Sequence, residues 1–447
     1  MTSTTPQPPR RSIPIGSAPP KAADKAAERE ALRAKYEAMP WRMEMLNAAP
    51  HRLGFFLAMV LLFVFSGWWA WVQIARVAGL FQPSYAIPPT LLHSAMMVLG
   101  FMPLYFAGFL FTAGPKWLHV EAPETRQVRG MMLMQAGGWL LWLMGGQGLY
   151  GLAIAGAIIA LLGLAWMFAY WWKLVRSSKV KDQVHARTVG IAGIIGCISL
   201  IGMIVSLLMD NVPTALLWVQ TGLWGFILFV FVAVAHRMIP FFTSNVLPLI
   251  EVWRPFWVLW LMLGAAGFEI LALWLQAFGI QGTAWLVVRG VVEIVLGGML
   301  LWLAVVWGLA QSLKIRLLAM LHIGFVWLGI TFVLFGLTQF AALRYGQGAL
   351  LLAPLHALTM GCLGSLVVAM VTRVSCGHSG RTLVADDTVW RLFLLLQVAV
   401  VLRLAGAFPG LSALLPLAAA AWFGIVLIWG NRLVPWYGKP RVDGKEG

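Results

Sequence analysis

The sequence predicts an all-α fold, a polytopic transmembrane helical bundle of about twelve spans. Hydrophobic residues make up 61% of the 447 residues and charged residues only 11%, a composition typical of a chain that folds in lipid. Apolar runs of roughly 18 to 25 residues, long enough to cross the hydrocarbon core as helices, recur along the chain. The predicted spans lie near 54–74, 90–111, 130–149, 150–172, 188–208, 212–236, 254–274, 283–305, 317–340, 350–372, 389–408 and 411–433.

The basic residues predict a topology for these spans. Of the 32 Lys and Arg, Arg76 and Arg344 fall in connections on one side and Arg289 and Arg403 fall within spans, so the other 28 lie on the side of the N-terminus. The positive-inside rule assigns that side to the cytoplasm. We therefore expect both termini to be cytoplasmic.

Three segments follow from this topology. Residues 1–50 form a basic cytoplasmic tail, in which the stretch 25–40 has the composition of a short surface helix that ends at Pro40. Residues 51–434 form the bundle, and residues 435–447 form a C-terminal cytoplasmic tail. Because the connections are too short for a globular domain, we expect the function to reside in the bundle.

The net charge of +16 does not indicate nucleic-acid binding. The basic residues flank the spans, where insertion bias and anionic lipid account for them. Three cysteines without CxxC or CxxCH spacing exclude a zinc ribbon, a disulfide scaffold and covalently attached haem. We expect membrane lipid and no nucleic acid among the partners.

Ionisable side chains within spans call for an explanation, since each costs roughly 2.5–3.5 kcal/mol in hydrocarbon. Arg289 and Glu293 are four residues apart on one helix face and can neutralise each other. We interpret them as an internal ion pair, with a proton path as the alternative. Glu269 has no partner in its own span and is expected to face Arg403 or Arg289.

Two histidines are predicted to lie near the non-cytoplasmic surface. His93 opens the second span and His356 lies a turn or two inside the tenth, and Met97 and Met360 follow them one turn later. Imidazole and thioether are ligands of haem iron and of copper. These four residues are therefore candidate metal ligands, and the alternative for each histidine is a simple anchor at the interface.

Two further histidines are predicted near the cytoplasmic surface. His236 ends the sixth span and His322 begins the ninth, so we expect them to form a second pair. Arg237 is expected to anchor the sixth span at the interface, and Pro240 to stop its helix because proline lacks a backbone donor. Three other histidines are assigned to cytoplasmic segments: His51, His119 and His185.

Three strings resemble the NnrS family of multi-pass bacterial membrane proteins: GFLFTAGPKW at 108–117, HRMIPFFTSNVL at 236–247 and PLHALTMGCLGSLVVAMVTRVSCGHSGR at 354–381. The resemblance covers most of the chain from the second span onward. It implies an inner-membrane protein that binds haem b, and also copper, and that functions in denitrification or in the response to nitric oxide. Because the sequence matches the family at these positions, the resemblance implies that His93, His356 and His378 are cofactor ligands.

One string departs from the family pattern. Members commonly open the second span with a Trp-His-x-His-Glu-Met type of string, of which this chain keeps His93 and Met97. The second His and the Glu are replaced by Ala95 and Met96. This departure predicts one metal fewer or a changed activity.

The string TRVSCGHSGR at 372–381 predicts a compact cationic loop on the cytoplasmic side, in which Gly377 and Gly380 are expected to take left-handed turns. A haem propionate, a phosphate headgroup or the acids at 386–387 would pair with the cations. The alternative is a loop that satisfies its own polar groups. The candidate cofactor-binding residues at this surface are Arg237, His236, His322, Arg373, His378 and Arg381.

Two functions of different classes follow. The resemblance implies a haem- and copper-binding protein of the NnrS type, with nitric oxide as a small-molecule ligand. The alternative is a solute or ion transporter without haem, which the span count and the intramembrane Glu269, Arg289 and Glu293 support. A subunit of a haem–copper oxidase is disfavoured because the chain has no adjacent histidines. The sequence leaves open whether the protein is an enzyme.

Overall fold

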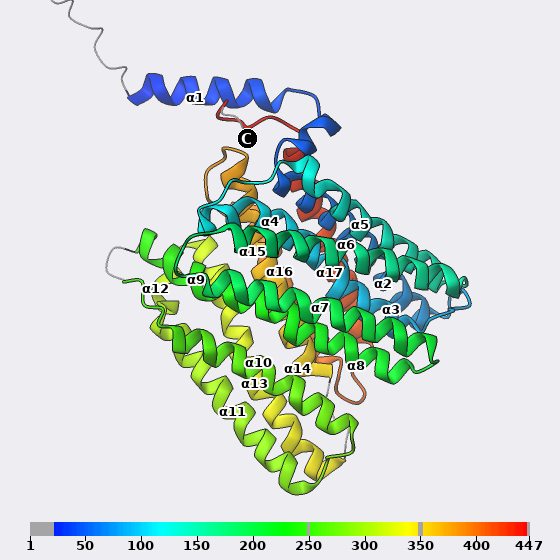
Figure 1. Ribbon diagram of the computed structural model, residues 1–447. Coiled ribbons are helices and arrows are strands. Elements are labelled where there is room, and N and C mark those ends of the chain that lie inside the picture. Colours follow the sequence, from blue (N-terminus) through cyan, green and yellow to red (C-terminus); the bar gives the residue numbers. More distant parts are fainter. Residues whose placement is uncertain (1–21, 248–250, 347–351, 445–447) are drawn as a thin grey trace, which may run out of the picture.

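The computed structural model describes residues 22–247, 251–346 and 352–444, which form a bundle of long helices (Figure 1). This part of the chain contains no strand, so the all-α prediction is confirmed. Two short helices precede the bundle, α1 (Ala22–Glu37) and the 3-10 helix η1 (Met43–Asn47). The first of these is the helix expected before Pro40.

Twelve long helical segments of the described residues follow the order of the predicted spans. The first six are α2 (Pro50–Ala78), α3–η2–α4 (Pro89–Ala95, Met96–Gly100, Met102–Leu118), α5 (Thr125–Gly146), α6 (Tyr150–Ser177), α7 (Val184–Leu208) and α8–η3–α9 (Val212–Gly222, Leu223–Leu228, Phe229–Val246). The last six are α10 (Phe256–Ala277), α11 (Thr283–Val306), α13 (Arg316–Tyr345), α14–η4–α15 (Leu352–His356, Ala357–Gly364, Ser365–His378), α16 (Asp387–Ala405) and α17 (Leu414–Tyr437). The short α12 (Leu309–Ser312) connects α11 to α13.

Eleven of these segments are long and apolar enough to cross a membrane, and α5 is the less apolar twelfth. The polar Gln135 of α5 is buried against α6, where its Nε2 donates to the carbonyl of Ala160. The two helices approach closely, since a Cβ added at Gly138 would lie 2.6 Å from the carbonyl oxygen of Gly156. Small residues permit such packing between membrane helices. The protein is therefore a multi-span membrane protein in a lipid environment.

Three of the long segments change from α-helical to π-helical geometry partway along. The π-helical segments are η2 in the second span, η3 in the sixth and η4 in the tenth. η4 begins directly after His356, and η2 begins three residues after His93. Such π-helical insertions occur frequently at functional sites.

The sixth span is longer than predicted. The expectation that Pro240 stops the helix is wrong, because α9 continues through it to Val246. Proline is tolerated inside membrane helices, where neighbouring side chains and local adjustments compensate for the lost backbone bond. The predicted connection at 237–253 is correspondingly shorter.

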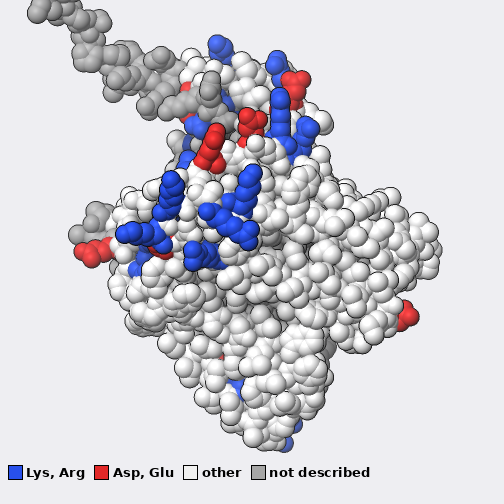
Figure 2. Space-filling view, viewed as in Figure 1, with Lys and Arg blue, Asp and Glu red and all other residues white. Residues whose placement is uncertain are grey.

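Most of the Lys and Arg side chains visible in Figure 2 gather at one end of the bundle, here called the basic end, and a few lie in the lower part of the view. α1 and the last described residues of the chain lie together there (Figure 1). Lys439 Nζ donates to the carbonyl of Glu37 at 2.7 Å, and the amide of Arg42 donates to the carbonyl of Gly438 at 2.8 Å. The opposite end carries the first residues of α3 and α14, and thus His93 and His356.

Candidate cofactor site

A cavity of about 310 Å³ lies between α2, α3, α8, α14, α16 and α17, in the half of the bundle away from the basic end. The π-helical segments η2, η3 and η4 all contribute to its wall. Pockets that hold small molecules or cofactors have volumes of about 300–1,000 Å³ and are mostly apolar, with a few polar groups that fix orientation. This cavity has that character.

His93 is held against the cavity by its neighbour on α2. Its ring stacks on Trp69, with ring centroids 3.9 Å apart and an interplanar angle of 16°. The His93 Nδ1 is buried and has no hydrogen-bond partner within the described ranges. A buried polar atom without a partner is costly, so this ring nitrogen is suited to a ligand.

His356 is oriented by its own helix. Its Nδ1 lies 2.8 Å from the carbonyl oxygen of Leu352. Because a carbonyl only accepts, Nδ1 carries the proton and Nε2 keeps its lone pair. Histidines that bind metals commonly donate their other ring N–H to a backbone carbonyl in this way.

Both predicted thioethers line the same cavity as the two histidines. Met97 belongs to η2 and Met360 to η4. His93 and His356 both line this cavity. The structure thus brings together His93, Met97, His356 and Met360, the four residues expected from the sequence to be near one another.

Arg403, one of the two partners expected for Glu269 from the sequence, lies at this cavity instead. It lies in the last turn of α16 and lines the same cavity as His93 and His356. Within the described ranges the Arg403 guanidinium has no ion pair and no hydrogen bond. An unpaired cation at this depth is suited to an anionic group of a bound molecule. The signal available in the sequence was the cost of the charge itself.

Two tryptophans of α17 complete the wall, and their N–H groups have partners in neighbouring helices. Trp422 Nε1 donates to Ser66 Oγ at 2.9 Å, and Trp429 Nε1 donates to Thr372 Oγ1 at 3.0 Å. These bonds fix both indoles while their apolar faces remain available to the cavity. The cavity wall is therefore pre-formed by packing.

The histidines predicted to pair near the other surface have different partners. His236 Nδ1 lies 2.9 Å from His185 Nε2, and His236 Nε2 lies 3.1 Å from the carbonyl oxygen of Pro255. His322 Nε2 lies 3.0 Å from Thr243 Oγ1. The described residues show no contact between His236 and His322, so their expected pairing is not observed. His185 is buried in α7, and sequence reasoning missed it because its partner is 51 residues away.

His378 is also paired, with a histidine that the sequence had assigned to a cytoplasmic segment. The His378 and His51 rings lie with centroids 4.2 Å apart, and His51 is buried at the start of α2. Arg373 lies over the ring of Phe242, with Cζ 3.8 Å from the centroid, and Arg237 lies over the ring of Trp117 at 5.1 Å. The basic-end candidates are thus stacked on aromatic neighbours from other helices.

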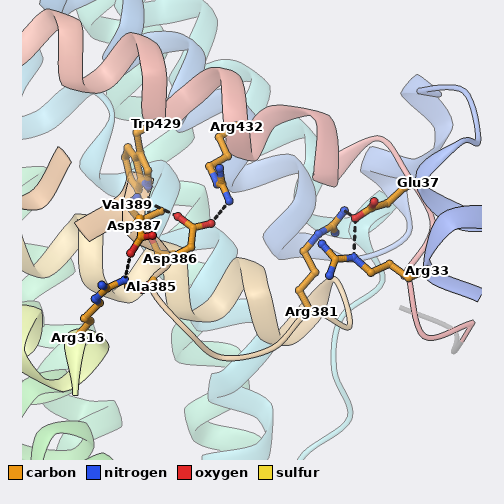
Figure 3. Close-up of polar contacts among 11 residues, drawn as sticks. Arg33, Glu37, Arg316, Arg381, Ala385, Asp386, Asp387, Val389, Trp429 and Arg432 are labelled. Atoms are coloured by element: carbon orange, nitrogen blue, oxygen red, sulfur yellow. Dashed lines mark hydrogen bonds and ion pairs between the residues drawn. The ribbon is translucent and has the colours of Figure 1, made fainter. Parts of the chain in front are cut away.

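Arg381 binds the N-terminal helix rather than the acids at 386–387. Its Nη2 lies 3.3 Å from Glu37 Oε1, and its guanidinium lies over the Trp436 ring. In Figure 3, Arg33 and Arg381 converge on Glu37. Asp386 instead pairs with Arg432, and Asp387 with Arg316. The proposed partnership of the loop with Asp386 and Asp387 is therefore wrong for Arg381.

The loop uses one of its two glycines as expected. Gly380 is left-handed, with φ of 76°, and a Cβ added there would lie 2.6 Å from Asp443 Cγ. Gly377, in contrast, lies within α15 and keeps a helical backbone. The amide of Val442 donates to the carbonyl of Ser379 at 3.0 Å, so this loop joins the chain's C-terminal segment to the bundle.

The donor set of the cavity suits a haem or a soft metal better than a hard one. In the part of the chain that the structure describes, no three His, Cys, Asp or Glu residues gather as a metal site. The cavity instead offers two imidazoles, two thioethers and a guanidinium, which are ligands for haem iron or copper and a partner for a carboxylate. The residues present therefore fit the group that the resemblance implies.

The fold and the cavity define a polytopic α-helical membrane protein with an internal, mostly apolar cavity. The family model described as NnrS protein matches residues 45–441, nearly the whole chain. The protein belongs to the NnrS family, and the resemblance inferred from three sequence strings is confirmed. Comparison with curated proteins gives no match.

Proposed function

We propose that this NnrS-family protein binds haem b in the cavity through His93 or His356. We further propose that it acts from the bacterial inner membrane in denitrification or in the response to nitric oxide. The observation that carries the proposal is that two imidazoles line one mostly apolar cavity. The Nδ1 of His93 has no hydrogen-bond partner within the described ranges, and the Nε2 of His356 keeps its lone pair.

Each cavity residue has a distinct part in this proposal. The Nδ1 bond to Leu352 orients the His356 ring, and the stacking on Trp69 orients His93. The Arg403 guanidinium would bind a propionate by a charge-assisted hydrogen bond. Trp422 and Trp429 limit the access of water. Haem iron, when bound, supplies a coordination site for a small ligand such as nitric oxide and a centre for electron transfer.

We propose copper as a second metal, bound by residues that line the same cavity. Thioethers are soft ligands that favour Cu(I), and Met97 and Met360 lie four residues after the two histidines. We place the cofactors here rather than at the basic end, where the stacking and ionic partners of Arg373, His378 and Arg381 are already supplied by the protein.

The test is the absorption spectrum and the metal content of the purified protein, expressed with iron and copper available. We expect haem bands in the wild type, and their loss or shift in His356→Ala and His93→Ala with expression near normal. His119→Ala is the control, because His119 is exposed at the C-terminus of α4. A wild-type protein without iron or copper would refute the proposal.

That outcome would favour the second candidate, a transporter of solute or ions without haem. The specific observation that supports a transporter is the buried group of Glu269, Arg289 and Glu293, because intramembrane charges often mark ion pathways.

A further inference from the structure

We propose that Glu269, Arg289 and Glu293 form a membrane-embedded site for one proton, shared between the two carboxyl groups. The site belongs to α10 and α11, and α11 packs along α13 in the lower part of the molecule in Figure 1. It is separate from the cavity, and the proposal does not depend on haem.

The ion pair predicted between Arg289 and Glu293 is confirmed and extended by Glu269. Arg289 Nε donates to Glu293 Oε1 at 2.6 Å, and Arg289 Nη2 donates to Glu269 Oε2 at 3.0 Å. Arg289 Nη1 donates to Gln276 Oε1 at 3.2 Å. Of the two partners considered for Glu269 from the sequence, Arg289 is the one observed.

The charges in this group do not balance. Two carboxylates face one guanidinium, and the three side chains are between 0 and 4% exposed. A net negative charge buried in the membrane would be costly. One added proton makes the group neutral.

Two carboxyl oxygens lack the donor that such a proton would supply. Glu269 Oε1 and Glu293 Oε2 are buried without a hydrogen-bond partner within the described ranges. The two carboxyl groups are nevertheless neighbours, because both are bound by the guanidinium of Arg289. A proton on one of them gives an O–H donor to the other, which satisfies both groups at once.

The neighbouring helices offer no other charge that compensates the group. The helices α8 and α12 and the segment η3 carry no charged residue, and α9 carries His236 and Arg237 at the basic end. On α13, Arg316 and His322 also lie at the basic end, and Arg344 is exposed in the last turn. The nearest polar group on α13 is the neutral amide of Gln339, which is buried, lies beside Glu293 and has an Nε2 without a partner.

The packing favours a proton over a hydrated metal cation. α11 and α13 are in backbone contact on either side of this group, since a Cβ at Gly336 would lie 2.6 Å from the carbonyl of Gly290, and one at Gly297 would lie 2.8 Å from the carbonyl of Gly329. A proton needs no added volume, whereas a cation with water ligands requires room between the helices.

The test is infrared spectroscopy of the full-length protein in lipid at neutral pH. We expect the carbonyl band of a protonated carboxyl group, shifted by ¹³C-labelled glutamate and by exchange into D₂O. The band should disappear in Glu269→Gln and in Glu293→Gln, because either change leaves one carboxylate balanced by Arg289. It should persist in the control Glu124→Gln, which alters an exposed glutamate.

Three results would overturn the proposal. The first is a wild-type protein without a glutamate-dependent band, which needs no variant to fold. The second is a band that survives in both single variants, since its proton would then reside elsewhere. The third is a band that appears only when sodium is removed, because a cation would then be the native occupant. The haem spectrum should be unchanged in both variants, so failure here is distinct from failure of the cofactor proposal.

Discussion

At the level of single residues, Arg403 shows what an isolated charge in a membrane helix indicates. The cost of the charge was visible in the sequence, but its place in the cavity was not, because the cavity is built from helices far apart along the chain. His93, His356 and their methionines could be predicted from span order and helical spacing. Trp69, His51 and His185 could not, since stacking across helices leaves no periodic signal.

Arg403→Gln is expected to weaken haem binding on the order of tenfold or more without changing the folded amount. Charge-assisted hydrogen bonds contribute roughly 1.5–3 kcal/mol, and about 1.4 kcal/mol corresponds to a tenfold change in affinity. Arg403→Lys should retain part of the affinity, because it keeps the charge but loses the planar fork. Haem titration of the apoprotein measures this, with the exposed Arg344→Gln as control. Equal affinity for Arg403→Gln and wild type would remove Arg403 from the site.

For the charged group on α10 and α11, too, the sequence did not reveal the partner on a neighbouring helix. The four-residue spacing on one helix predicts an isolated ion pair of Arg289 and Glu293. In such a pair, the loss of either residue would leave the other charge unpaired. The structure adds Glu269, so Arg289 keeps a partner when Glu293 is neutralised. Residue spacing in the sequence predicts which side chains are neighbours on one helix. The net charge of this group also depends on Glu269, which lies on the adjacent helix.

At the level of elements, helix order was predictable and helix irregularities were not. The length and apolar character of the runs predicted each span. They predicted even α5, in which the buried Gln135 donates a hydrogen bond to a carbonyl of α6. The π-helical segments and the passage of α9 through Pro240 arise from packing between helices, which compensates for local backbone preferences. The three π-helical segments border the cavity, so elements that could not be predicted form part of the candidate site.

The docking of α1 on the basic end is expected to depend on pH through Glu37. Burial raises the pKa of Glu37, but hydrogen bonds and charges from Arg33 and Arg381 outweigh it, and the pKa lies below its ordinary value. A lowered pKa stabilises the docked state above the unfolded pKa, and this contribution is lost as pH falls through the folded pKa. Docking should therefore weaken below about pH 4.3, the ordinary value for glutamate.

The mobility of a spin label at the exposed Ala34 measures this docking. Glu37→Gln should raise the mobility already at neutral pH and remove its dependence on acid, whereas Glu44→Gln in η1 should behave as wild type. Unchanged mobility in Glu37→Gln at neutral pH would show that the carbonyl bond from Lys439 holds α1 without the ion pair.

At the level of the whole molecule, charge placement predicts the orientation in the membrane. The basic residues gather at one end, with α1 and the C-terminal segment (Figure 2). Whether this end faces the cytoplasm depends on the positive-inside rule and on α5 crossing the bilayer, because one span fewer would invert every later connection.

Reporter fusions test this orientation. A reporter after Lys445 should be active only in its cytoplasmic form, and one inserted near Gly348 only in its external form. If α5 does not cross, each reporter should be active only in the opposite form, because both lie after that span. Activity of both reporters in the same form would mean that an odd number of the last three spans, α14–η4–α15, α16 and α17, fails to cross.

The location of the haem can be measured as haem bound per protein in two double variants. His93→Ala/His356→Ala removes the imidazoles of the cavity, and His51→Ala/His378→Ala removes the stacked pair at the basic end. We predict that the first variant folds but lacks haem, and that the second retains haem with the wild-type spectrum. Haem retained in the first variant and lost from the second would place the cofactor at the basic end and contradict the assignment of the cavity.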